Sequence, residues 1–170
     1  MVYGTLDKID AADINWYINI NINATTYMTQ LLLPKLLNRP NANLRSAIFC
    51  ISSPFARDMT DVYGPYGALK RYVEAFTATL QKQYSNKIDS MLVIPGSVKS
   101  GFNPGTMKNS VSTEEHCKTV IDHLGRYGET RGARLHAYHH WSENDSPWSL
   151  VWGPYARYQL LMACKAVCEK

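Results

Sequence analysis

Two short runs of apolar residues constrain the fold more than any other feature of this sequence. Residues 46–51 read Ser-Ala-Ile-Phe-Cys-Ile, and residues 91–94 read Met-Leu-Val-Ile. Such continuous runs are typical of strands that are covered on both faces, as in a parallel sheet. Parallel neighbours need a crossover of a dozen or more residues, and residues 52–90 are long enough to provide one. We therefore expect an α/β fold.

The residues around these runs have the periodicity of helices. Apolar side chains recur at helical spacing over residues 12–38 and 66–84, so we expect a helix in each range. Pro34 lies inside the first pattern and should kink or end that helix. Further along, Ser112-Thr-Glu-Glu115 has the spacing of a capping box and predicts the start of a third helix.

The C-terminal part of the chain completes the predicted order of elements. Residues 134–138 alternate like a third strand, and residues 149–167 predict a terminal helix. The whole order predicts a small parallel sheet of about three strands with flanking helices, whose first strand has an exposed apolar edge. We divide the chain into a domain over residues 1–140 and an aromatic-rich tail or helix over residues 141–170.

Composition and charge exclude several classes of function. The net charge of +4 comes from scattered Lys and Arg residues without an aromatic stripe, so we expect no nucleic-acid partner. The four cysteines lack CxxC spacing, which favours a reducing compartment. No run approaches the roughly 20 apolar residues that span a bilayer. The aromatic tail favours packing as a helix or against a partner, with a peripheral membrane contact as the alternative.

Three histidines, His136, His139 and His140, raise the question of a metal site. Alternation along a strand would place His136 and His140 on one face and His139 on the other. We therefore expect no metal site here.

The strongest chemical signal is the pair Tyr66 and Lys70 at the start of the second predicted helix. Their spacing places both side chains on one face of that helix. An ammonium beside a phenol favours the phenolate, so the pKa of Tyr66 should fall, making it a general acid or base for a carbonyl/alcohol interconversion. Ser53 ends the first predicted strand, and its hydroxyl could reach the same carbonyl oxygen. The alternative is a surface helix after an ordinary loop.

Asn21 is a further candidate, because it lies inside the first predicted helix, where Asn is a poor helix former. We expect it to bind a water that relays protons to Lys70, with a surface or capping role as the alternative. Pro95 and Gly96, directly after the second predicted strand, close the set.

These residues resemble the catalytic Asn-Ser-Tyr-Lys tetrad of the short-chain dehydrogenase/reductase family. The family's Pro-Gly-x-Val-x-Thr segment is matched by residues 95–100, Pro-Gly-Ser-Val-Lys-Ser, in which Ser replaces Thr and keeps the hydroxyl. Residues 20–23 and 28–34 are similar to the very-long-chain 3-oxoacyl-CoA reductase and 17β-hydroxysteroid dehydrogenase branch. The resemblance covers residues 1 to about 140.

The resemblance implies reduction of a 3-oxoacyl-CoA or steroid-like carbonyl with NAD or NADP as cofactor. Tyr66 would protonate the carbonyl oxygen and Ser53 would hold and polarise it. Lys70 would lower the pKa of Tyr66 and bind the nicotinamide ribose, while Asn21 would hold the relay water. The implied cofactor-binding residues are Tyr66, Lys70, Pro95, Gly96, Val98 and Ser100.

The sequence also departs from the family pattern. The family's Gly-rich turn, the residue that selects NAD or NADP, and its Asn-Asn-Ala-Gly strand are not found, and Met1 aligns just after the last of these. We therefore expect the C-terminal, catalytic half of a Rossmann-like doubly wound sheet, completed by an N-terminal half or a partner and not active alone. Pro54 replaces a residue that is often Gly in the family, which should alter the substrate pocket.

Partners and location follow from the same resemblance. Helices 12–38 and 66–85 would form an interface with a second copy or a complementary chain, which would also cover the edge of residues 48–51. The protein would be intracellular and associated with the endoplasmic reticulum membrane, with a mitochondrial location as the alternative. The second hypothesis for function is a catalytically inert, reductase-derived structural subunit of a larger, for example organellar, assembly.

Overall fold

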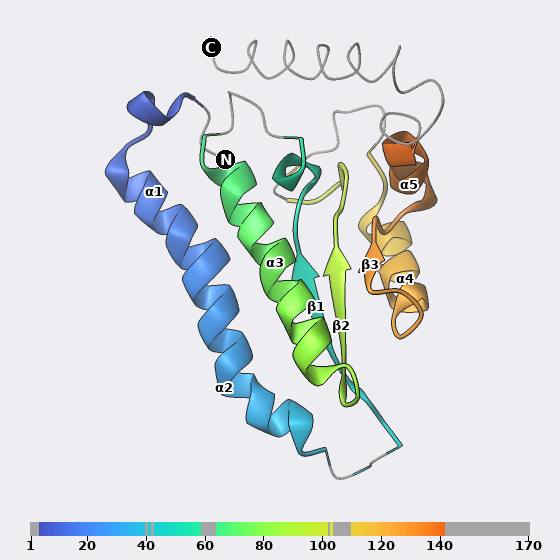
Figure 1. Ribbon diagram of the computed structural model, residues 1–170. Helices are drawn as coiled ribbons and strands as arrows, with labels where there is room; N and C mark the ends of the chain where they lie inside the picture. Colours follow the sequence, from blue (N-terminus) through green and yellow to red (C-terminus); the bar gives the residue numbers. More distant parts are fainter. Residues whose placement is uncertain are drawn as a thin grey trace.

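The computed structural model describes residues 4–39, 41, 43–58, 64–101, 103 and 110–141. It is an α/β fold in which a three-stranded parallel sheet is flanked by helices, as predicted (Figure 1). The labelled elements are α1 (Ala11–Ile18), α2 (Thr25–Leu37), β1 (Ser46–Ile51), α3 (Tyr66–Tyr84), β2 (Ile88–Val93), α4 (Thr113–His123), β3 (Glu129–Thr130) and α5 (Arg134–His140). A π-helical stretch (Asn19–Ala24) joins α1 to α2, and single 3₁₀ turns cover Leu6–Lys8 and Pro54–Ala56.

The predicted helix over residues 12–38 is present but irregular. The α1, π-helical and α2 segments follow one another without a break from Ala11 to Leu37 (Figure 1). Asp10 caps the start, because its side chain accepts a hydrogen bond from the backbone N–H of Ala12 at 2.9 Å.

The sequence predicts that Pro34 kinks or ends this helix, and the structure shows that it does not end it. The helix continues through Pro34 to Leu37. Pro34 and Gln30 are both exposed, so the Gln30 carbonyl that the proline leaves without an intrahelical donor can be hydrated.

β2 is the central strand and pairs in parallel with β1 on one side and β3 on the other. Ser46 lies opposite Ile88 and Ile51 opposite Val93, so the carboxyl ends of β1 and β2 are level. β2 begins at Ile88 rather than at residue 91, because Asp89 and Ser90 interrupt the apolar run without interrupting the strand.

The exposed edge predicted for the first strand is present in the described sheet. β1 has a strand neighbour on one side only. Cys50 is buried against Val73 and Leu80 of α3, whereas Phe49 and Ile51, on the other face, are 39% and 49% exposed. The edge strand therefore leaves apolar surface uncovered.

The third predicted strand is wrong in place and length. Residues 134–138 belong to the helix α5, and the third strand is the two-residue β3. The backbone N–H groups of Leu92 and Ile94 donate to the carbonyls of Gly128 and Thr130, at 2.9 and 2.8 Å, which holds β3 to the sheet. Two residues are too few to leave a period-two pattern, and residues 134–138 mimicked one because the apolar Leu135 and Ala137 alternate with polar residues.

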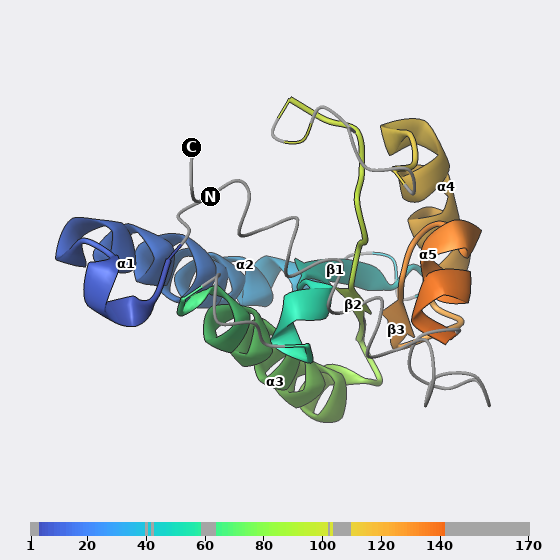
Figure 2. The same ribbon diagram turned by 90° about the horizontal axis from the view of Figure 1, so that it is seen from above.

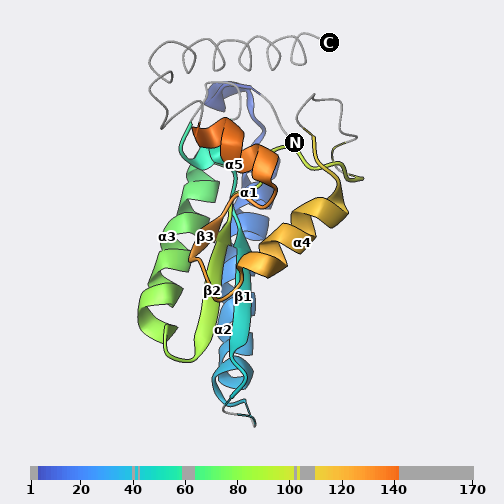
Figure 3. The same ribbon diagram turned by 90° about the vertical axis from the view of Figure 1, so that its right-hand side faces the viewer.

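The two faces of the sheet are covered by different helices. α3 packs on one face through the cluster of Cys50, Val73 and Leu80, and α4 covers the other face beside Met91 and Val93 (Figures 2 and 3). The long N-terminal helix lies beside α3, and the Thr26 and Tyr72 hydroxyls are hydrogen-bonded between them at 2.6 Å. The site residues are thus carried by a packed α3–sheet unit.

Apolar surface remains exposed along the long N-terminal helix. Its exposed large side chains are Trp16, Ile20, Tyr27, Met28, Leu31 and Leu32. In the part of the chain that is described, no helix has both the length and the apolar character needed to cross a bilayer. The predicted tail helix over residues 149–167 lies outside the described residues.

Candidate active site

The candidate site lies at the carboxyl ends of two neighbouring parallel strands. Ser52 and Ser53 follow β1, and Ile94 and Pro95 follow β2. The Ser52 N–H donates to the Val93 carbonyl at 2.8 Å, which extends the strand pairing to this point. The carboxyl ends of parallel strands are the place where α/β sheets bind ligands.

Ser53 and Tyr66 are brought together as predicted. Ser53 is 7% exposed, and its Oγ accepts the N–H of Phe55 at 3.4 Å at the start of the 3₁₀ turn. Tyr66 opens α3 and lies close enough to Ser53 for the serine side chain to lower the pKa of the phenol. The rings of Tyr17 and Phe55 lie 6.2 and 6.5 Å from the Tyr66 ring. The phenol is therefore held between two aromatic rings, with its polar end on the serine.

Lys70 lies one turn further along α3 and completes this group. Its Nζ is 5.6 Å from the centre of the Tyr66 ring. The same ammonium donates to the Ile51 carbonyl at the end of β1, at 3.0 Å. Burial lowers the pKa of Lys70. The serine, phenol and amine thus lie in one region of the structure.

The pKa of Tyr66 moves in the direction opposite to the one we expected. Burial of the phenol is the largest effect and raises its pKa, the Ser53 hydrogen bond lowers it, and the nearby Tyr17 phenol raises it. The prediction was wrong because desolvation of the phenolate is the largest effect, while the Lys70 ammonium is directed to the Ile51 carbonyl. In this structure Tyr66 is a protonated phenol at neutral pH.

Asn21 is buried, 7% exposed, and belongs to the π-helical stretch rather than to a regular α-helix. Its Nδ2 donates to the Tyr17 carbonyl one turn earlier, at 3.0 Å. Short π-helical insertions occur frequently at functional sites. A surface position for Asn21 is thus excluded, and the side chain is tied to Tyr17, whose ring packs beside Tyr66.

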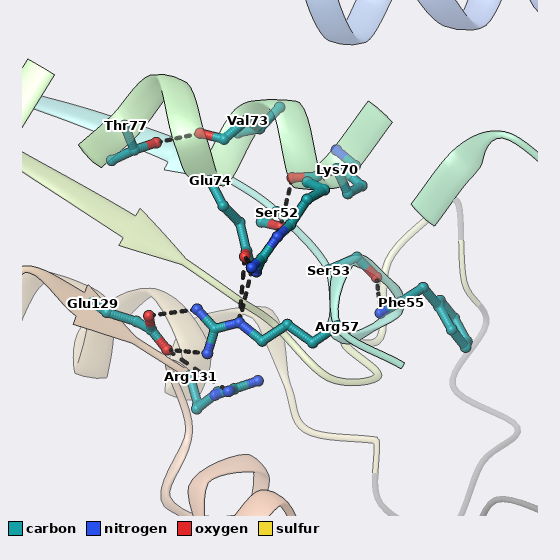
Figure 4. Close-up of polar contacts among 11 residues, drawn as sticks. Ser52, Ser53, Phe55, Arg57, Lys70, Val73, Glu74, Thr77, Glu129 and Arg131 are labelled. Carbon is teal, nitrogen blue, oxygen red and sulfur yellow. Dashed lines mark hydrogen bonds and ion pairs between the residues drawn. The ribbon is translucent and has the colours of Figure 1, made fainter. Parts of the chain in front are cut away.

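A charged network that the sequence analysis missed holds the end of β1 against α3 and β3 (Figure 4). Glu74, 6% exposed, accepts hydrogen bonds from Ser52, Arg57 and Arg71, of which the last is 2.6 Å long. Arg57 also donates twice to Glu129 of β3, at 3.0 and 2.7 Å, and these bonds raise the pKa of the arginine. Glu74 lies one turn after Lys70, and a carboxylate on the apolar face of α3 was the signal that could have revealed it.

The segment predicted to contact the cofactor runs from Pro95 to Ser100. Val98 forms an isolated parallel bridge with Val111, made by hydrogen bonds from Lys99 N–H to the Val111 carbonyl and from Val111 N–H to the Ser97 carbonyl. In such a bridge the N–H and C=O of Val98 itself point to the other side of the strand. Ser100 is exposed and hydrogen-bonded with Asn103.

Two other observations bear on the site. A cavity of about 200 Å³ lies at the amino ends of the strands, lined by residues that include Arg45, Asp89 and Tyr127, and so is remote from Tyr66. In the described ranges, no three His, Cys, Asp or Glu side chains are grouped as metal ligands. The alternation argument for His136 fails because it is helical, and the side chains of His139 and His140 are outside the described set.

Comparison with known proteins gives a consistent answer. A family model described as short chain dehydrogenase matches residues 2–111. The very-long-chain 3-oxoacyl-CoA reductase of Anas platyrhynchos is 28% identical over 150 residues, and the 17-beta-hydroxysteroid dehydrogenase type 3 of Homo sapiens is 28% identical over 127 residues. These matches cover 86% and 73% of this chain, but 44% and 40% of the relatives. The chain thus spans less than half the length of these relatives.

Solved structures agree on the fold. A short chain dehydrogenase from Salmonella enterica serovar Typhi superposes with a TM-score of 0.64 at 21% identity, over 75% of this chain and 56% of that one. A short chain dehydrogenase from Burkholderia cenocepacia in complex with NADP gives a TM-score of 0.51 at 21% identity, over 82% of this chain and 53% of that one.

Proposed function

Because the chain belongs to the short-chain dehydrogenase family, we propose that it carries the catalytic residues of a nicotinamide-dependent carbonyl reductase or alcohol dehydrogenase. The observation that supports this most directly is the proximity of the Ser53 side chain to the Tyr66 phenol, with the Lys70 ammonium 5.6 Å from the centre of the phenol ring. These groups lie at the carboxyl ends of β1 and β2, where a carbonyl-bearing ligand would be expected.

Each side chain has a role that its surroundings support. Tyr66, protonated at neutral pH because burial raises its pKa, donates a proton to the carbonyl oxygen during reduction. Ser53 shares its hydroxyl with Tyr66 and holds the same oxygen. Alcohol oxidation instead needs the phenolate, so its rate should rise with pH while reduction is supported at neutral pH. Lys70 would supply a positive charge beside Tyr66, and Asn21 would hold a relay water.

The residues present fit a nicotinamide cofactor, which when bound supplies or accepts the hydride. The peptide N–H and C=O of Val98 point away from Val111, and such a donor and acceptor pair matches a carboxamide. Tyr66, Lys70, Pro95, Gly96 and Ser100 are the other residues that would hold the cofactor. Which of NAD and NADP is preferred does not enter this proposal.

We further propose that this chain corresponds to the second half of a Rossmann-type domain. Its β1 edge, with Phe49 and Ile51 exposed, would be covered by a preceding half or by a partner chain. The exposed apolar side chains of α1 and α2, with α3 beside them, would form the contact with a second copy or a complementary chain.

The names of the relatives support a finer substrate class. A 3-oxoacyl thioester or a steroid ketone is the substrate we propose, since the two relatives named above carry these activities in their names. An inert structural subunit is the second candidate. The feature that favours it is the Lys70 ammonium, which is bound to the Ile51 carbonyl instead of lying close to the Tyr66 oxygen.

The substitution Tyr66→Phe tests the catalytic proposal in the protein that contains this chain. We expect loss of NADH- or NADPH-dependent ketone reduction by about 10²- to 10⁴-fold, because the proton donor is removed. Tyr72→Phe is the matched control, since Tyr72 lies on the same helix but is bonded to Thr26, and it should retain activity. Equal turnover by Tyr66→Phe and wild type would exclude the mechanism, and a wild-type protein that binds neither cofactor would favour the structural subunit.

A further inference from the structure

His136 contacts the backbone of the predicted cofactor segment and has no role in the function proposed above. It lies on α5, outside the residues that match the family, and is 6% exposed. The Gly96 N–H donates to its Nδ1 at 3.2 Å, and its Nε2 lies 3.1 Å from the Ser97 carbonyl oxygen. One ring therefore contacts two consecutive residues of the segment.

These two contacts determine the protonation state of the ring. Nδ1 accepts from a backbone N–H and so carries no hydrogen. A carbonyl oxygen can only accept, so Nε2 carries the hydrogen and donates to Ser97. His136 is thus the neutral, Nε2-protonated tautomer, and protonation would put an N–H against the Gly96 N–H.

The glycine at position 96 is required by this ring. Gly96 does not have a positive φ, so backbone conformation alone would allow other residues. A Cβ at position 96, however, would lie 2.6 Å from Cδ2 of His136 and 2.9 Å from Cγ and Nε2. The imidazole and the peptide chain are therefore in direct contact, with no space for a side chain.

A second imidazole lies beside His136 in the described structure. The titratable group that faces it is His116 of α4, with ring centres 6.1 Å apart, and the segment 95–98 presents only backbone and uncharged side chains. The buried Nδ1 of His116 has no hydrogen-bond partner in the described structure, and burial is the main cause that lowers the pKa of His116. A positive charge on His136 would lower that pKa further. Among the described residues, no carboxylate pairs with either ring.

The position of Ser97 depends on several bonds of which His136 supplies one. Its carbonyl also accepts the Val111 N–H at 3.1 Å, and its Oγ is bonded with Ser110 at 2.6 Å and accepts from Asn103 at 2.8 Å. Gly96, by contrast, is held by the imidazole. The peptide from Gly96 to Ser97 leads directly to Val98, whose peptide groups we assigned to the cofactor carboxamide, so the imidazole acts at the start of this segment.

We infer that His136 is a positioning residue of the nicotinamide site, whose neutral imidazole fixes the peptide from Gly96 to Ser97 and thereby the cofactor-binding groups of Val98. The inference rests on the proposed function, and it adds a residue from α5 to the site.

A pair of variants with the same shape tests this inference in the protein that contains the chain. His136→Asn keeps an acceptor oxygen at the place of Nδ1, whereas His136→Leu has the shape of Asn without polar atoms. Leaving the Gly96 N–H unpaired should weaken NADH or NADPH binding about tenfold in the Leu variant, with the Asn variant within about threefold of wild type. Binding is measured by titration, alongside thermal unfolding to verify the fold.

A control variant and an NMR measurement distinguish a positioning role of His136 from a general effect of the substitution on packing. His123 of α4 is bonded to Thr130 at 2.6 Å, away from Gly96, so His123→Leu should lower stability without changing cofactor affinity. Nitrogen chemical shifts of the imidazole, measured without cofactor, should show the hydrogen on Nε2. A hydrogen on Nδ1, or equal cofactor affinity in the folded Leu variant and wild type, would overturn the inference about His136 but leave the proposed function intact. A wild-type protein that binds neither NADH nor NADPH would instead overturn the proposed function, and the inference with it.

Discussion

The ends of β1 and β2 lie side by side, but different chemistry holds each in place. After β1, the chain is fixed by charged groups, with Arg57 between the carboxylates of Glu74 and Glu129 (Figure 4). After β2, it is fixed by a neutral imidazole at Gly96 and by the backbone bridge of Val98 with Val111. Arg57 is one-third exposed and remains hydrated, whereas Ile94, which precedes the second segment, is fully buried. Glu74 and His136 are both 6% exposed, so the two anchors differ in their partners and not in burial. The buried carboxylate is paired with two arginines that reach solvent, which teaches that a charge is kept in a buried anchor where such counterions are within reach.

The largest change in stability is expected when an isoleucine is truncated at the end of each strand. Ile94→Ala should lower the free energy of unfolding by about 3 kcal/mol, because Ile94 is 0% exposed and would leave a cavity. Ile51→Ala should cost less than about 1 kcal/mol, because Ile51 is 49% exposed. Urea unfolding of the two variants measures both values. Equal losses would mean that the β1 edge is covered in solution.

A smaller effect is expected from adding one methyl group at the end of β2. Gly96→Ala should destabilise the protein by about 2 kcal/mol, since its Cβ meets the His136 ring. Gly101→Ala is the matched control: no atom lies within 4 Å of the new Cβ, and stability should change by less than about 0.5 kcal/mol. Combining Gly96→Ala with His136→Ala should recover part of the loss, and strict additivity in thermal unfolding would argue against the contact.

Breaking the charged anchor of β1 should have a somewhat smaller effect that depends on salt. Arg57→Gln leaves the buried Glu74 with Arg71 as its remaining cation, and we expect a loss of about 1–2 kcal/mol. The difference in unfolding free energy between Arg57→Gln and wild type should decrease at high ionic strength, because the Arg57 ion pairs are partly exposed to solvent. Arg126→Gln, an exposed control, should change stability by less than about 0.5 kcal/mol. A loss that does not depend on salt would assign the role of Arg57 to packing.

The smallest expected effect is the pH dependence of stability that comes from His116, near the end of β2. Burial lowers the pKa of His116, so the unfolded chain binds a proton at this residue more readily than the folded one. This contribution to stability is therefore complete above the ordinary histidine pKa, about 6.5, and decreases as the pH falls below it. His116→Gln should flatten the decrease in melting temperature between neutral pH and about pH 5.5. An unchanged slope would show that His116 is not the group responsible.

The parts of the fold that could be predicted are those in which one segment contains the whole signal. α3 shows its apolar face, and Tyr66 and Lys70 lie on it one turn apart. Ser112 forms the predicted cap, because its side chain accepts the Glu115 N–H at 3.1 Å. β1 was predicted with its bounds, since six apolar or small residues in a row have few alternatives.

The parts that could not be predicted depend on contacts between distant segments. β3 is a strand only because Leu92 and Ile94 donate to it. The roles of Arg57 and His136 require the loop after β1 and the helix α5 to meet partners that no spacing in the sequence reveals. The pKa of Tyr66 also belongs to this class, because its direction is decided by how deeply the ring is buried.

The π-helical stretch sets the helical phase of everything that follows it. In an uninterrupted α-helix, Tyr17 and Thr26 would point about 180° apart. One inserted residue delays the rotation by about 100°, which leaves the two side chains about 80° apart, so that both can face α3. Tyr17 can then pack on Tyr66 while Thr26 bonds to Tyr72, so a single helix is joined to α3 at two levels. Asn21 occupies the stretch where that rotational offset is introduced, which links the candidate site to the alignment of the two helices.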